Sequence, residues 1–327
     1  MPYRQIGTTG NQTEQMLIRM QRTQAWDMGR ARLERAGLLP ERKSRDDRDF
    51  GDGYEYHTID IEEVEVGATG EGGYPRPPPN VPLPARETGV YYPTRKILIA
   101  KRPTIVSRHL TDVAREQDAP GLWDALQDYV DTVEPDLTYQ LKPTLKIGTW
   151  SFFKLAHPPL PFAPLVGPLL DFVRATPARK NAGGDQTREA KYDTVLIEEY
   201  PQREGIYRYR AARVRVIFQL SSFCQRDIPE PLAYVEWFDR FSGQLRPSEL
   251  VATRPSRTGS VRHTAVIPIA RICMACQLVP KYHEVKDLGT IFSTDDLLDT
   301  FPRFLFNPYS TDYSWSLWDH WDRLGVI

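Results

Sequence analysis

Short runs in which hydrophobic and polar residues alternate fill the C-terminal part of the chain, residues 191–327. In RVRVIFQL (213–220), a period of two places both valines and Phe218 on one face of a strand, and both arginines and Gln219 on the other. Turn-rich loops separate these runs and no helix of crossover length lies between them, which favours an antiparallel barrel or sandwich. We expect strands at residues 192–200, 213–220, 232–238, 264–269, 272–279 and 304–309.

Helical periodicity occurs at both ends and in the middle of the chain. Residues 11–37 carry a narrow apolar stripe, and Gly37 suits a helix C-cap. Residues 102–117 and 119–133 predict two further short helices. At the C-terminus, a helix would place Trp315, Trp318 and Trp321 in one stripe that we expect to pack on the core or a neighbouring domain. The predicted fold class is α+β: an N-terminal helix and linker, then a helical pair packed on an antiparallel small β-barrel or sandwich.

Composition divides the chain into four segments. Residues 51–66 carry six acids and no Lys or Arg, and residues 67–93 are rich in Gly and Pro, so that neither a helix nor a central strand is expected there. The predicted segments are a helical N-terminal part (1–50), an acidic and Pro/Gly-rich linker that we expect to be disordered (51–95), a mixed helical and extended segment (96–190), and an antiparallel β domain with a Trp-rich C-terminus (191–327).

Charge and cysteine content restrict the compartment and the partners. The formal net charge is −1, so that any affinity for a polyanion must come from local clusters. Three cysteines do not make a disulfide framework, which predicts a reducing, intracellular compartment. The N-terminus lacks an apolar signal segment, and no apolar run approaches the ~18 residues of a membrane span. We therefore expect neither secretion nor a membrane partner.

The pair Cys273-Met-Ala-Cys276, followed by His283, leaves three alternatives open. A structural zinc site commonly has four ligands, whereas only one cysteine pair is present. A redox pair should follow a strand and open a helix, whereas this pair lies inside the apolar run RICMACQLV. We favour two small buried residues in a strand. A metal site at Cys273, Cys276 and His283 and a redox pair remain the alternatives, and we expect no cofactor.

Other chemistry-bearing patterns favour structural roles. Asp295, Asp296 and Asp299 in STDDLLD suit the first turn of a helix, where acids favour the positive end of the dipole, better than a metal site. The six histidines are scattered, and the chain has no G-x-S-x-G, H-E-x-x-H, Walker A or G-x-G-x-x-G motif. We therefore expect no catalytic residue and a protein that is not an enzyme.

Basic residues cluster beside aromatic ones. IYRYRAARVRV places four arginines within eight residues, and residues 240–271 hold six arginines against one acid, Glu249. Arginines beside aromatic residues on an exposed strand suit phosphate contact and base stacking. The alternative is a solvated face whose arginines pair with the chain's own acids. The candidate nucleic-acid-binding residues are Arg208, Arg210, Arg213, Arg215, Arg254, Arg257 and Arg262.

Several sequence blocks, taken together, resemble a known family. In chain order they are GNQTEQMLIRMQR, KRPTIV followed by LWDALQDYV, WSFFKLAHPP, KYDTVLIEE, LAYVEWF, AVIPIARICMACQLVPKY and DDLLDTFPRFLFNPY. They resemble the C-terminal, post-catalytic region of fungal transposases of the Plavaka and Kyakuja–Dileera–Zisupton type. No single block is a mechanistic motif, so the resemblance rests on their number and order over most of residues 5–310.

The resemblance implies a role, a partner and a location. The family's catalytic acids and Cys-rich zinc segment lie upstream of the matched region, which implies a transposon-derived fragment or degenerate copy that does not cut DNA. Cys276 matches a family cysteine, but Gln277 stands where the family has a histidine, which weakens the metal alternative. The resemblance implies a nuclear, accessory DNA- or chromatin-contacting tail, with final strands similar to bromo-adjacent homology domains. The competing functions are a protein-interaction or self-association module without nucleic-acid binding, and a metal-dependent enzyme that uses the CxxC pair.

Overall fold

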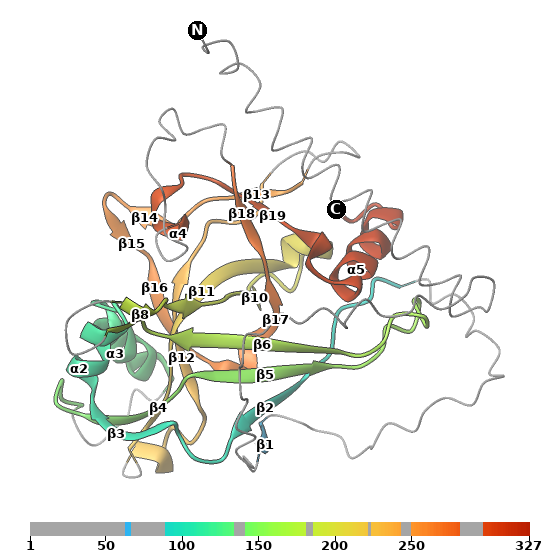
Figure 1. Ribbon diagram of the computed structural model, residues 1–327. Helices are drawn as coiled ribbons and strands as arrows, with labels where there is room; N and C mark the ends of the chain where they lie inside the picture. The colour runs from blue at the N-terminus through green and yellow to red at the C-terminus, as the bar shows by residue number, and fades with distance from the viewer. Residues whose placement is uncertain are drawn as a thin grey trace, which may run out of the picture. The chain divides into compact units, whose positions relative to one another are not determined.

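The computed structural model describes residues 63–66, 89–133, 141–180, 186–221, 224–242, 250–281 and 297–327 (Figure 1). The predicted helix at 11–37, most of the predicted linker, and the residues His283, Asp295 and Asp296 lie outside these ranges. From Glu63 onward the chain forms one unit with an α+β architecture. No helix within the described ranges is long and apolar enough to cross a membrane.

Two antiparallel sheets carry most of the described strands (Figure 1). The larger sheet has the order β16-β12-β11-β10-β17, and β4 joins β3 to the far half of β11. Its strands are β3 (Ile105–His109), β4 (Lys146–Trp150), β10 (Thr194–Glu198), β11 (Tyr209–Leu220), β12 (Leu232–Trp237), β16 (Thr264–Pro268) and β17 (Ile272–Cys276). The smaller sheet has the order β1-β2-β5-β6-β9, with β1 (Glu63–Val66), β2 (Lys96–Ala100), β5 (Phe152–His157), β6 (Leu169–Thr176) and β9 (Lys191–Tyr192). The described strands do not close into a barrel.

Short strand pairs and helices complete the unit. The remaining strands are β7 (Arg179–Lys180), β8 (Gln186–Arg188), β13 (Ala252–Thr253), β14 (Arg257–Thr258), β15 (Val261–Arg262), β18 (Leu278–Pro280) and β19 (Phe304–Phe306). The helices are α2 (Leu110–Glu116), α3 (Leu122–Val133), α4 (Leu297–Thr300) and α5 (Asp312–Arg323). The predicted helix at 119–133 is confirmed as α3, whereas the one predicted at 102–117 is helical only over α2. Its first half is strand β3, because it pairs with β4.

Three apolar clusters form the core. One lies between the two sheets, where Ile97 and Phe153 of the smaller sheet pack with Val214 and Val235 of the larger. A second lies under α2 and α3, and the third lies under α5. The first cluster draws on strands from both predicted segments, 96–190 and 191–327. The boundary expected at residue 190 therefore does not separate two cores.

The C-terminal helix α5 confirms the predicted tryptophan stripe. Thr311 caps it in a reciprocal capping box with Ser314, which satisfies backbone groups at the helix start. Trp318 and Trp321 are buried in the third cluster, and the Trp321 indole N–H donates to the carbonyl oxygen of Tyr91 at 2.8 Å. The stripe is therefore part of the core.

A β-bulge in β11 overturns the two-face assignment made for residues 213–220. The register with β12 shifts between Val214 and Val216, so that Arg215 is an extra residue. Val214 faces the cluster between the sheets, while Val216 faces the cluster under α3. The bulge reverses the alternation, and the side chains of Arg213 and Arg215 both reach Glu236 of β12.

This places a buried ionic network between the apolar clusters. Arg213 Nε donates to Glu236 Oε2 at 2.7 Å, and Arg215 Nε donates to Glu236 Oε1 at 3.1 Å. Their outer nitrogens pair with Asp299 of α4 and with Asp118, each at 2.7 Å. Only 2% of the Arg213 side chain and 6% of the Arg215 side chain are exposed, against 8% for Glu236. Burial lowers the pKa of Arg213, but the two carboxylates outweigh burial and raise the pKa above its usual value.

Glu236→Gln removes the shared charge and leaves two buried guanidinium groups without it. We expect the free energy of unfolding to fall by about 3 kcal/mol. The reason is that the two guanidinium groups stay buried, while the charge that offset the cost of removing them from water is lost. Urea unfolding of the two proteins measures the difference. The matched control is Glu116→Gln, which removes a surface partner of Arg108 and should cost less than about 1 kcal/mol. If both variants lost the same free energy of unfolding, the assignment of Glu236 as a buried, stabilising partner of the two arginines would be contradicted.

The hydrogen bond between His320 of α5 and the backbone of Tyr91 should be sensitive to acid. Its Nε2 lies 3.3 Å from the amide nitrogen of Tyr91, whose N–H it accepts, and its ring stacks on Phe162 at 4.0 Å. Burial lowers the pKa of His320, so that the fold favours the neutral ring. The unfolded chain therefore binds more protons, and stability falls as the pH drops through the window below the ordinary histidine pKa. Between about pH 7.5 and 5, His320→Gln should lose less thermal stability than the wild type. An identical loss would exclude His320 as the cause.

Candidate functional site

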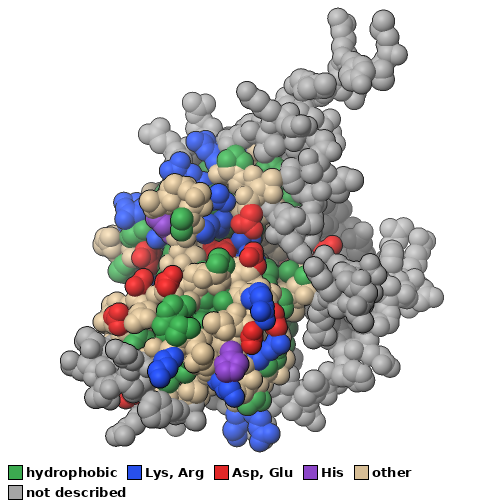
Figure 2. All heavy atoms as spheres, turned by 90° about the vertical axis from the view of Figure 1, so that its left-hand side faces the viewer, with side chains coloured by type: hydrophobic (Ala, Val, Ile, Leu, Met, Phe, Trp, Pro, Cys, Tyr) green, Lys and Arg blue, Asp and Glu red, His purple; other side chains and the backbone are tan. Residues whose placement is uncertain are grey.

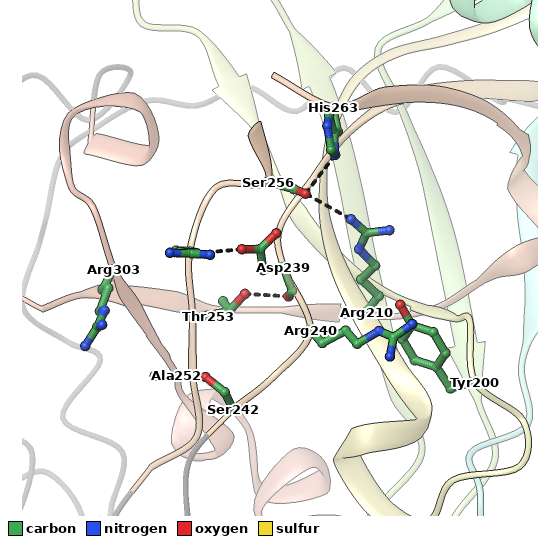
Figure 3. A pocket seen from close by; sticks show the side chains of 11 residues that line it. Tyr200, Arg210, Asp239, Arg240, Ser242, Ala252, Thr253, Ser256, His263 and Arg303 are labelled. Carbon is green, nitrogen blue, oxygen red and sulfur yellow. Dashed lines mark hydrogen bonds and ion pairs between the residues drawn. The ribbon is translucent and has the colours of Figure 1, made fainter. Parts of the chain in front are cut away.

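An open cavity of about 620 Å³ lies where β11, β13 and the segment after β12 meet (Figure 3). Among the described residues that line it, four arginines face one acidic residue, Asp239. The arginines are Arg210, Arg240, Arg254 and Arg303. They lie on β11, after β12, after β13 and before β19, so that the fold and not local sequence brings them together.

Aromatic rings hold two of these guanidinium groups. The Arg210 guanidinium lies 4.7 Å from the ring centroid of Trp237, and the Arg240 guanidinium lies 4.2 Å from that of Tyr200. Arg210 Nε also donates to the carbonyl oxygen of Phe238 at 2.7 Å. Figure 3 shows Arg240 beside Tyr200 at one side of the pocket. These contacts fix the cations before any ligand arrives, which lowers the entropic cost of binding.

The wall of the pocket is built by hydrogen bonds between two loops. Asp239 N–H donates to the carbonyl oxygen of Arg254, and Thr253 Oγ1 donates to that of Asp239, both at 2.7 Å. Arg254 Nε donates to Asp239 Oδ2 at 2.6 Å, while 67% of the Arg254 side chain stays exposed. Burial raises the pKa of Asp239, but hydrogen bonds from Arg254 and Ser256 and the charges of Arg254 and Arg210 outweigh it, and the pKa is lowered. Asp239 is thus ionised at neutral pH, and the arginines still outnumber it.

A serine–histidine contact lies at the back of the pocket. Ser256 Oγ is 3.0 Å from His263 Nδ1 and accepts a hydrogen bond from Arg210 Nη2 at 3.1 Å (Figure 3). A nucleophilic serine of the hydrolase type needs exposure and a base whose second nitrogen is oriented by a carboxylate. Ser256 is only 3% exposed, and the second nitrogen of His263 contacts Thr258. The contact therefore positions Arg210 and the loop.

The structure divides the seven predicted arginines into four groups. Arg210 and Arg254 line the pocket. Arg213 and Arg215 are buried in the network around Glu236, so that the exposed face expected for them is wrong. Arg208 lies over the ring of Tyr92 at 4.3 Å and is ion-paired with Glu198.

The last two predicted arginines, Arg257 and Arg262, gather around Asp299. Arg262 Nη1 lies 3.6 Å from Asp299 Oδ1, and Arg257 Nη2 lies 3.4 Å from the backbone oxygen of Asp299. Burial lowers the pKa of Arg262 to about 10. Figure 2 draws the side of the molecule that lies on the left in Figure 1, and shows Lys and Arg side chains gathered in its upper part, at the height of β14, β15 and α4. We call this region the basic zone. The seven predicted arginines therefore do not form one continuous strand face.

Sequence reasoning missed two arginines and one aromatic residue of the pocket. Arg240 belongs to the arginine-rich stretch 240–271 but carries no local signal that separates it from its neighbours. Arg303 and Tyr200 lie in segments with no basic clustering. Only the pairing of β13 with β19 and the course of the chain after β10 bring them to the site.

The CxxC pair occupies β17 as two buried or half-buried thiols. Cys273 Sγ donates to the carbonyl oxygen of Arg271 at 3.5 Å. The Thr194 hydroxyl donates to the backbone carbonyl oxygen of Cys276 at 2.6 Å. Burial raises the pKa of Cys273, and it raises the pKa of Cys276 to about 12. Within the described ranges no three His, Cys, Asp or Glu side chains are grouped to hold a metal ion, and His283 lies outside those ranges.

Thiol reactivity tests this position of the cysteines. Because burial disfavours the thiolate that reacts, the native thiols should react with Ellman's reagent at least about tenfold more slowly than those of the unfolded chain. Mass spectrometry of the labelled peptides separates Cys273 and Cys276 from Cys224, which is also buried. Fast labelling of Cys273 or Cys276 in the native protein would contradict burial and revive a redox or metal role.

Comparisons with known proteins give no relative. No family model, no curated protein and no solved structure matches this chain.

Proposed function

We propose that this protein is a non-catalytic nucleic-acid-contacting module that binds the phosphate backbone of DNA through the arginine pocket. The observation that carries the proposal is the pocket itself, whose described lining residues include four arginines and one carboxylate. A guanidinium presents donors in a planar fork that matches phosphate oxygens. Phosphate contacts of this kind position a protein on a duplex without reading its sequence.

The charges of the chain support a local and not a global attraction. The net charge is −1, so that the molecule as a whole does not attract a polyanion. The buried arginines around Glu236 are neutralised by the chain's own acids, whereas Arg254 stays largely exposed beside Asp239, and three further arginines line the same pocket. We further propose, from the sequence resemblance, that this contact belongs to an accessory tail of transposase origin acting on DNA or chromatin in the nucleus.

The salt dependence of DNA binding tests the pocket. Arg240→Gln combined with Arg254→Gln removes two exposed cations from its rim. The slope of log K against log salt should become less steep by about one for each phosphate that the variant no longer binds. Fluorescence anisotropy with a labelled duplex over a salt series measures it.

A matched control removes the same charge elsewhere. Arg115 and Arg323 are also exposed and each is ion-paired with one aspartate, so that Arg115→Gln combined with Arg323→Gln makes the same net change. This control should leave the slope unchanged. Equal slopes for the wild type and the pocket variant would refute the pocket as the DNA contact. If the pocket variant and the control changed the slope equally, DNA binding would depend on the net charge of the protein and not on the pocket.

A further inference from the structure

The edge strand of the larger sheet has an open side. β16 is the last strand of that sheet, and within the described ranges it pairs only with β12. Trp237 N–H donates to the carbonyl oxygen of His263, and Ile269 N–H donates to that of Pro231, just outside either end of β16. Because backbone groups alternate sides along an antiparallel ladder, the N–H and C=O of Thr264 and Val266 point away from β12.

A groove of about 520 Å³ follows this open edge. Helix α3 forms one wall with Tyr129 and Val133, and Trp237 contributes to the lining from β12. Val133 is 46% exposed although it is apolar. No hydrogen bond within the described chain reaches the outward backbone groups of Thr264 or Val266. A sheet edge of this kind, with an apolar wall beside it, can accept one more strand.

Acidic side chains outnumber basic ones among the described residues that line the groove, which favours a positively charged ligand. Asp128, Glu199 and Glu230 line it, against one cation, Arg271. Arg271 is paired with Glu199 at 3.0 Å, and Glu230 accepts a hydrogen bond from the Tyr129 hydroxyl at 2.7 Å. Figure 2 shows acidic and hydrophobic side chains below the basic zone, at the height of β16 and α3. A second copy of this chain would bring the same acids together, which disfavours pairing of β16 with itself.

We propose that an extended, lysine- or arginine-bearing segment of a partner protein adds to β16 as a further strand. Its backbone would satisfy the outward groups of Thr264 and Val266, and its basic side chains would meet Asp128 and its acidic neighbours. Pro268 has no N–H to offer, which confines pairing to the first part of β16. The proposal stands independently of DNA binding, because it uses a different cavity and the opposite charge.

Peptide binding tests the occupant. The probe is a fluorescent peptide of about eight residues that alternates lysine and valine. Two control peptides carry glutamate for lysine, or the same sequence with N-methylated amides that cannot pair. The lysine peptide should bind at least about tenfold more tightly than either control. Equal binding of the N-methylated peptide would overturn strand addition, and equal binding of the glutamate peptide would overturn the charge assignment.

A variant and a second readout locate the site. Asp128→Lys should weaken the lysine peptide, whereas Asp131→Lys, the same change on an exposed position of α3 outside the groove lining, should not. Amide exchange at Thr264 and Val266 should become slower once the peptide is bound, while Ala265 and Ile267, which pair with β12, stay protected throughout. Protection of Thr264 and Val266 without peptide, rising with protein concentration, would show self-pairing and overturn the proposal.

Discussion

The buried ion pairs of Glu236 with Arg213 and Arg215 are the interaction on which the rest of the structure depends. A charge in a low-dielectric interior is tolerated only when its partners are fixed by good geometry. The network reaches Asp299 of α4 and Asp118 before α3. It thereby ties the central strands β11 and β12 to two distant segments. It also separates the apolar cluster under α3 from the one under α5, each of which packs on the same face of β11.

The same two strands position both candidate binding regions. Arg210 lies on β11 before the bulge and rests on the ring of Trp237 at the end of β12. Trp237 also contributes to the groove beside β16. A cationic pocket and an acidic groove therefore share one aromatic residue and a rigid sheet. The near-zero net charge of the chain conceals this division, because charges of opposite sign are gathered in different places.

Arginine content alone is a poor guide to the surface of this protein. The four arginines of residues 208–215 look equivalent in the sequence, yet two are buried, one is ion-paired beside Tyr92, and one lines the pocket. The bulge at Arg215 changes which apolar cluster the following side chains face, and Asp118 and Asp299 lie over the side from which Arg213 and Arg215 reach Glu236. A bulge adds one residue to a strand and has no reliable signature in an alternating pattern. Whether an arginine binds a ligand or a carboxylate of its own chain thus depends on which distant segments pack over it.

By itself, the sequence determined the identity of several central elements. The strand patterns predicted β10, β12 and β16, the apolar run around Cys273 predicted β17, and helical spacing predicted α3 and the buried tryptophans of α5. These features depend on neighbours within a few residues, and local periodicity carries that information. Tertiary structure alone decided which charges are buried, how Arg240, Arg303 and Tyr200 meet Arg210, and that β16 has an open edge. Each of these depends on strand order and register between distant segments, for which the chain has no local signal.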